Sequence, residues 1–133
     1  MQVVVFTLSN EQFAVETARV QGINDMMEIT KVPNAPAYIK GLINLRGNVI
    51  SLLDINLILN LEKLDTTQNN IIILHMEEEL VGIVVDKVDE VLEIDEDIIE
   101  RVEDEQMELY VKGVINFKDR IVTLIDIDKL LAN

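Results

Sequence analysis

Few side chains in this sequence are of the kinds that carry acid–base, nucleophilic or metal chemistry. The 133 residues include one histidine and no cysteine, so zinc thiolate sites, disulfides and thiol nucleophiles are excluded. His75 stands in the apolar run 71–76, where a strand would make it a packed or surface residue. The sequence contains no glycine-rich phosphate loop and no nucleophile elbow. We therefore predict that the protein is not an enzyme and that it holds neither a metal nor a cofactor.

Carboxylates are abundant, but their spacing does not form a metal site. The runs Glu77–Glu79, Asp95–Asp97 and Glu103–Glu105 lack the spacing and the glycine of a calcium-binding loop, so each is interpreted as a solvated loop. The net charge of −14 disfavours nucleic acid and anionic membrane surfaces as partners. No apolar run reaches the roughly 18 residues of a membrane-spanning helix, and the N-terminus lacks the basic segment of a signal peptide. These features predict a cytoplasmic protein.

Against this acidic background, one arginine is a candidate for binding. Arg46 is one of eleven basic residues, and it precedes Gly47 in a string typical of a tight turn, where glycine permits a positive φ angle. A planar guanidinium beside such a turn suits recognition of a protein partner. The alternative is that Arg46 is simply a solvated residue at the tip of a hairpin.

The elements that would position these residues are organised as an internal repeat. Residues 112–131 repeat residues 40–59 without a gap, 72 positions later, and eight of the twenty positions are identical. Residues 71–83 repeat residues 3–15 more weakly, 68 positions later, and each of these two segments has the pattern of a hairpin. The polar linker 62–70 separates the two halves.

Each half of the repeat predicts five short strands followed by one short helix. The predicted strands are 3–8, 12–16, 18–24, 41–46 and 49–54 in the first half, and 70–76, 80–86, 88–94, 112–117 and 121–126 in the second. Positions kept in both halves are expected to serve the shared fold. Asp54 and Asp126 have the type and position of helix N-caps, and Gly41 and Gly113 are expected to permit a close backbone approach.

These patterns predict an all-β fold with short helices, in a single domain over residues 1–133. Five strands with one aliphatic face each can remove their exposed edges by closing into a small barrel. We expect two five-stranded barrels related by an approximate two-fold axis, with residues 1–61 and 71–133 as the two halves and some strand material shared. The alternative is a single β-sandwich. Either fold exposes aliphatic β surface, which favours an interaction module that binds proteins.

Three segments of the sequence resemble the CheW family of bacterial chemotaxis coupling proteins, and the resemblance covers essentially the whole chain. They are EITKVPNAPAYIKGLINLRGNVISLLDI (28–55), VGIVVDKVDEVLEI (81–94) and GVINFKDRIVTLIDIDKLL (113–131). The resemblance implies two SH3-like barrels and a cytoplasmic scaffold at receptor arrays. Such a scaffold links the signalling tips of chemoreceptors to the histidine kinase CheA, whose regulatory domain it binds.

The same resemblance implies a set of contact residues. The arginine of the NLRG string falls on Arg46, which in the family belongs to a receptor-contacting groove, and the matching groove positions are Val20, Gln21, Asn44 and Leu45. Kinase docking in the family uses apolar strand residues of the first half, which the sequence alone does not single out.

The sequence departs from the family pattern at several positions, which leaves other functions open. The departures are Gly22, Asn24 and Asp25, Ser51, and the run 56–59. One alternative is a regulatory module of a kinase or of a receiver-fused coupling protein, and another is a divergent scaffold with a different partner. Because the chain starts with Met just before its first strand and ends soon after its last helix, we expect a free-standing protein.

Overall fold

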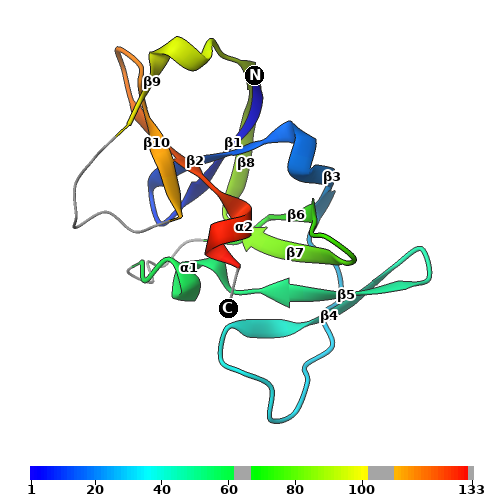
Figure 1. Ribbon diagram of the computed structural model, residues 1–133. Helices are drawn as coiled ribbons and strands as arrows, with labels where there is room; N and C mark the ends of the chain where they lie inside the picture. The colour runs from blue at the N-terminus through cyan, green and yellow to red at the C-terminus, as the bar shows by residue number, and fades with distance from the viewer. Residues whose placement is uncertain (62–66, 102–109, 132–133) are drawn as a thin grey trace.

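The computed structural model describes residues 1–61, 67–101 and 110–131, which form two β-sheets joined by short helices and turns (Figure 1). One sheet contains β1 (Gln2–Leu8), β2 (Glu11–Glu16), β8 (Lys87–Glu93), β9 (Ile99–Glu100), β10 (Val111–Asn116) and β11 (Ile121–Ile125). The other contains β3 (Val20–Asp25), β4 (Ile39–Leu45), β5 (Asn48–Leu53), β6 (Asn70–His75) and β7 (Leu80–Val85). The helices are α1 (Ile55–Ile58) and α2 (Ile127–Leu130), with 3-10 turns η1 (Thr17–Arg19) and η2 (Glu96–Ile98).

All ten predicted strands are present, and each begins and ends within two residues of its predicted bounds. The two-residue strand β9 was not predicted. The acidic run Glu103–Glu105 and linker residues 62–66 lie outside the described residues. Among the described residues, no helix is long and apolar enough to cross a membrane.

The two sheets do not correspond to the two halves of the sequence. The strand orders are β8–β1–β2–β11–β10–β9 and β3–β6–β7–β5–β4, so each sheet combines a hairpin from one half with strands from the other. The division into residues 1–61 and 71–133 therefore describes the repeat but not the sheets. The apolar faces of β1 and β6 give a physical reason for this exchange of strands. Both strands are apolar on both faces, and both faces are buried only when a strand lies in the interior of a sheet.

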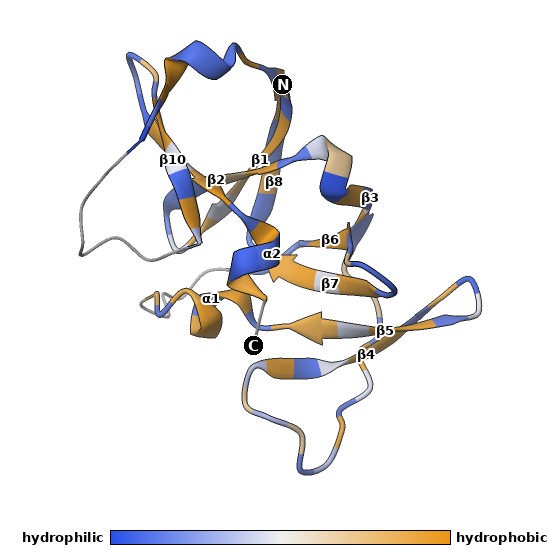
Figure 2. Cartoon of the chain, viewed as in Figure 1, coloured by the Kyte–Doolittle hydropathy of each residue, from blue (hydrophilic) through white to orange (hydrophobic). Residues whose placement is uncertain are grey.

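The alternation of side chains along β1 shows how a strand with two apolar faces is used. Val3 and Val5 point into the core of the six-stranded sheet. Val4, Phe6 and Leu8 point the other way, into a core that lies between the two sheets. In the same manner, β6 divides its apolar residues between the core of the five-stranded sheet and the core between the sheets. Figure 2 shows the orange, apolar course of the central strands.

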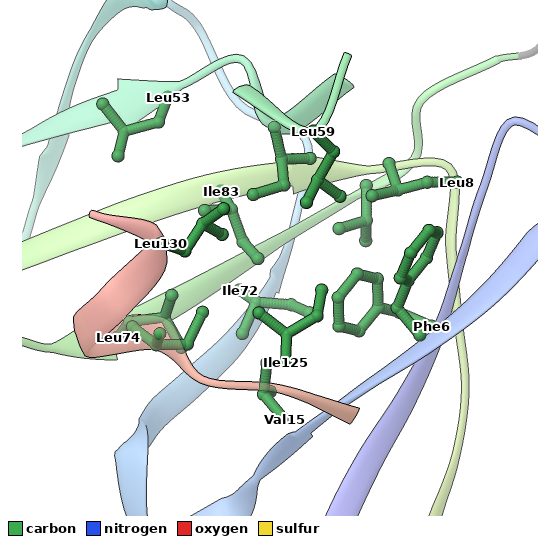
Figure 3. Close-up of a cluster of buried hydrophobic side chains, with 14 of the residues drawn as sticks. Phe6, Leu8, Val15, Leu53, Leu59, Ile72, Leu74, Ile83, Ile125 and Leu130 are labelled. Atoms are coloured by element: carbon green, nitrogen blue, oxygen red, sulfur yellow. The ribbon is translucent and has the colours of Figure 1, made fainter. Parts of the chain in front are cut away.

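The core between the sheets joins the two halves into one body. Side chains from both sheets and both helices converge there, as Figure 3 shows for Phe6, Ile72, Ile83, Ile125 and Leu130. Each sheet also has a separate core of its own. This arrangement differs from the single β-sandwich considered as the alternative, because a sandwich has one core between its two sheets.

The two glycines kept in both halves occupy equivalent crowded positions. A Cβ atom on Gly41 would lie 2.6 Å from the carbonyl oxygen of Thr30, and one on Gly113 would lie 2.8 Å from that of Glu100. Each glycine also stands at a register shift of its hairpin, β4–β5 or β10–β11. The shared glycines therefore let a neighbouring strand or loop approach the backbone closely.

Candidate docking surface

The tip of the β4–β5 hairpin is a tight two-residue turn. It turns through Arg46 and Gly47, whose φ angles are +54° and +86°. Since Leu45 pairs with Asn48, the loop has two residues, and two positive φ angles define a type I′ turn. The side-chain Oδ1 of Asn44 accepts a hydrogen bond from the Gly47 N–H at 3.0 Å. Arg46 is thereby held in the left-handed region, which costs a residue with a Cβ about 1–2 kcal/mol.

The side chain of Arg46 is exposed and takes part in none of the ion pairs found among the described residues. Arg19 and Arg120, by contrast, pair with Asp128 and Glu90. Figure 1 shows the β4–β5 hairpin extending away from the body of the protein. The tip therefore presents an exposed cation on a protein of net charge −14.

The equivalent hairpin of the second half, β10–β11, is held against its own sheet. Arg120 follows its two turn residues, lies 5.1 Å from the ring centre of Phe117 and pairs with Glu90 on the edge strand β8. The position equivalent to Glu90 in the first half is Gly22, which has no side chain to offer. The equivalent of Arg120 is Asn48, which is exposed. The first-half tip therefore lacks the ion pair that holds the second-half tip in place.

The other predicted groove residues lie on two separate strands. Asn44 and Leu45 end β4 beside Arg46, where Asn44 is exposed and Leu45 packs against the core of the five-stranded sheet. Val20 and Gln21 begin β3, where Val20 packs against the core between the sheets and Gln21 is exposed. Because β3 and β4 are the two edge strands of this sheet, strand pairing does not bring these two groups together.

Two exposed aliphatic residues on the same sheet were not singled out from the sequence. Ile23 on β3 is 41% exposed, and Val49 on β5 is 67% exposed. Their equivalents in the second half, Val91 and Ile121, are exposed to 49% and 60%. The sequence repeat does place aliphatic residues at both pairs of matching positions. On a strand with one buried face, however, which of them are exposed depends on the register of the strand.

The described residues contain no group of histidine, cysteine and carboxylate side chains that could hold a metal ion. His75 is exposed at the end of β6.

One protein family matches nearly the full length of the chain. The model described as a CheW-like domain matches residues 2–133. This chain belongs to the CheW family. CheW-family proteins are non-catalytic scaffolds of chemotaxis, so the prediction that this protein is not an enzyme is confirmed.

Individual CheW proteins are similar over most of their length. The chemotaxis protein CheW of Klebsiella aerogenes is 32% identical over 133 residues, which cover 97% of this chain and 80% of that protein. The chemotaxis protein CheW of Bacillus subtilis is 28% identical, over 98% of this chain and 86% of that protein. The crystal structure of the scaffolding protein TtCheW from Thermoanaerobacter tengcongensis has a TM-score of 0.83 and 30% identity, over 93% of this chain and 87% of that one. This match confirms the predicted CheW fold of two SH3-like β-units with short helices.

The departures from the CheW pattern fall at defined places in the structure. Gly22 lies on the edge strand β3, and its nearest neighbour for an added Cβ is Asn24 Oδ1 at 3.7 Å. Ser51 lies on β5 and lines a cleft beside α2. Asn56 in α1 donates a hydrogen bond to the Ser9 hydroxyl at 2.7 Å. One departure therefore changes an edge strand, one changes a cleft, and one supports a contact within the protein.

Proposed function

We propose that this protein couples the signalling tips of chemoreceptors to a CheA-type histidine kinase through contacts between proteins. The single observation that carries the proposal is the tip of the β4–β5 hairpin, where Arg46 is exposed, held at positive φ and unpaired among the described residues. A planar guanidinium presented on such a turn suits recognition of a protein partner. The place of action is the cytoplasm, at receptor arrays that the protein reaches through its partners.

The receptor contact centres on Arg46. The guanidinium supplies the charged group, Asn44 holds the turn that presents it, and Leu45 packs the end of β4 against the sheet. Val20 and Gln21 contribute from β3, as a second part of the contact on the far edge of the same sheet.

The kinase contact uses apolar strand residues of the first half. Ile23 on β3 and Val49 on β5 are the exposed aliphatic residues of those strands, so they are our candidates for docking the regulatory domain of the kinase. Exposed aliphatic groups on a rigid sheet gain stability when a partner removes them from water, by roughly 25 cal/mol for each Å² buried. Two exposed aliphatic side chains bury only a small apolar area, so we expect a kinase contact of moderate affinity rather than a permanent complex.

Calorimetric titration with the regulatory domain of the kinase, and co-sedimentation with receptor-containing membranes, test the two contacts separately. We expect a Kd of about 1 μM or tighter for the kinase domain. Arg46→Glu should weaken receptor association by roughly tenfold, because it replaces an interface cation with an anion. The matched control is Lys118→Glu, which makes the same charge change at the equivalent tip of the second half and should leave receptor association unchanged.

The outcomes separate this function from others. Unchanged receptor association in an Arg46→Glu variant with a normal melting curve would remove Arg46 from the contact. Absence of any heat of binding with the kinase domain, for a correctly folded protein, would contradict the coupling function and would point to a CheW-type scaffold with another partner.

A further inference from the structure

The internal repeat produces two equivalent junctions, and they carry different side chains at matching positions. At each junction, a single-turn helix that follows a strand of one sheet lies near the turn of a hairpin of the other sheet. The first junction combines α1 with the β1–β2 turn, and the second combines α2 with the β6–β7 turn. Because the repeat aligns the two residue by residue, one junction serves as a control for the other.

The first junction is closed by its own side chains. The amide of Asn56 donates a hydrogen bond to the hydroxyl of Ser9, which is itself buried. Beneath this contact, Leu8 and Phe13 are buried, and the ring of Phe13 stacks on Phe6 with centroids 6.0 Å apart. A hydrogen bond between two neutral side chains therefore joins α1 to the β1–β2 turn, and buried aromatic rings pack below it.

The second junction carries different residues at the equivalent positions. Asp128 stands in the place of Asn56, and Glu77 stands in the place of Ser9. Two carboxylates cannot share the hydrogen bond that an amide and a hydroxyl make, and at neutral pH they repel each other. Val81 stands in the place of Phe13, so the side chain below the second junction is smaller and fills less volume.

A cleft is present at this second junction, which we name the α2 cleft. Its inner part has a volume of about 310 Å³ and is lined mainly by apolar residues, among them Tyr38, Ile58, Met76, Val81 and Leu131. Its outer part, which shares Met76, Glu79 and Leu131 with the inner part, is bordered by Glu77, Glu78 and Asp128. Arg19 at this border already pairs with Asp128, whereas the glutamates 77–79 belong to no ion pair among the described residues.

We propose that the α2 cleft is a second docking site, separate from the β4–β5 tip, for a partner segment with one large apolar side chain flanked by lysine or arginine. The apolar inner part takes the large side chain, and the three glutamates at the mouth take the flanking cations. The occupant follows from charge complementarity, since the border is acidic and its one arginine is already paired. A second copy of this chain is a poor occupant, because its net charge of −14 repels an acidic border.

The methyl groups of methionine report on this site by NMR. The chain has five methionines, of which Met76 lines the cleft, while Met26 and Met27 follow the end of β3. The probes are two synthetic peptides of equal length, each with a central tryptophan, flanked by lysines in one and by glutamates in the other. We expect the lysine peptide to shift the Met76 methyl signal saturably, without moving Met26 or Met27, and to bind several-fold more weakly at higher salt.

Variants then locate the binding. Val81→Phe introduces the residue of the closed junction and should abolish the Met76 shift. Glu77→Ser changes only an exposed residue, so it keeps the fold if the first variant is unstable, and it should weaken the lysine peptide several-fold. Arg46→Glu should bind the lysine peptide like the parent protein, which separates this site from the proposed receptor contact. A Met76 signal that does not move, that moves equally with the glutamate peptide, or that moves unchanged in Glu77→Ser would overturn the proposal.

Discussion

Asp54 and Asp126, 72 positions apart in the sequence, make the same hydrogen bond in the two halves of the protein. Each precedes a single-turn helix and accepts a hydrogen bond from a backbone N–H three residues later, Leu57 for Asp54 and Lys129 for Asp126, both at 3.2 Å. The backbone N–H of each aspartate also donates to a tyrosine carbonyl at 2.7 Å. These two aspartates, kept in both halves, therefore serve the fold.

The caps give the first prediction. Asp54→Ala and Asp126→Ala should each lower the free energy of unfolding by about 1 kcal/mol, because each removes one N-cap. Urea denaturation followed by circular dichroism measures this loss. Binding of the kinase domain by the folded fraction should be unchanged, and a large binding loss without a stability loss in either variant would show that the aspartate is a contact residue.

The shared glycines give the second prediction. Gly41→Ala and Gly113→Ala should each destabilise the protein by about 1–3 kcal/mol, because the new methyl group would overlap a backbone carbonyl that cannot move freely. Thermal melts compare these variants with Gly22→Ala, whose methyl group would have room. This control should change stability by less than about 0.5 kcal/mol. Equal melting temperatures for all three variants would contradict the crowding at the two register shifts.

A third prediction concerns the closed tip of the second half. Arg120→Ala removes a half-buried ion pair with Glu90 and the contact with the Phe117 ring, so it should cost about 0.5–1.5 kcal/mol. The loss should shrink at high salt, because the ion pair is partly exposed. Asn48→Ala at the equivalent position of the first half should have little effect on stability. A stability of Arg120→Ala equal to the parent at low salt would show that the tip is not held by this contact.

Much of this fold could be predicted from the repeat, because strand bounds follow from local patterns of apolar residues. The pairing of the strands could not be predicted in the same way. The parallel contacts of β2 with β11 and of β5 with β7 join distant segments, and no local pattern specifies them. The exchange of hairpins between the sheets follows from these contacts, so it became apparent only in three dimensions.

The candidate sites were also partly predictable from local sequence and partly dependent on the three-dimensional structure. Arg46 and its turn could be identified from Gly47 and the string around it, although the positive φ of Arg46 itself could not. The exposure of Ile23 and Val49 depends on which face of each strand the neighbours cover. The repeat shows a difference at the α2 cleft, because the equivalent residues Asn56 and Asp128 differ in charge. That this difference bears on a contact between helix and turn became apparent only from the hydrogen bond of Asn56 to Ser9.

The final prediction separates stability from function at the β4–β5 tip. Arg46→Gly relieves the cost of a positive φ and should raise the free energy of unfolding by about 1 kcal/mol, because glycine adopts this conformation freely. The same change should weaken receptor association, because it removes the guanidinium. Lys118→Gly is the matched control: Lys118 has no positive φ, so glycine there should not stabilise the protein. A variant that is both more stable and a weaker binder would mean that the strain at Arg46 is maintained for the contact. A variant that is more stable and binds receptor as well as the parent would mean that the turn is strained for no purpose related to receptor binding.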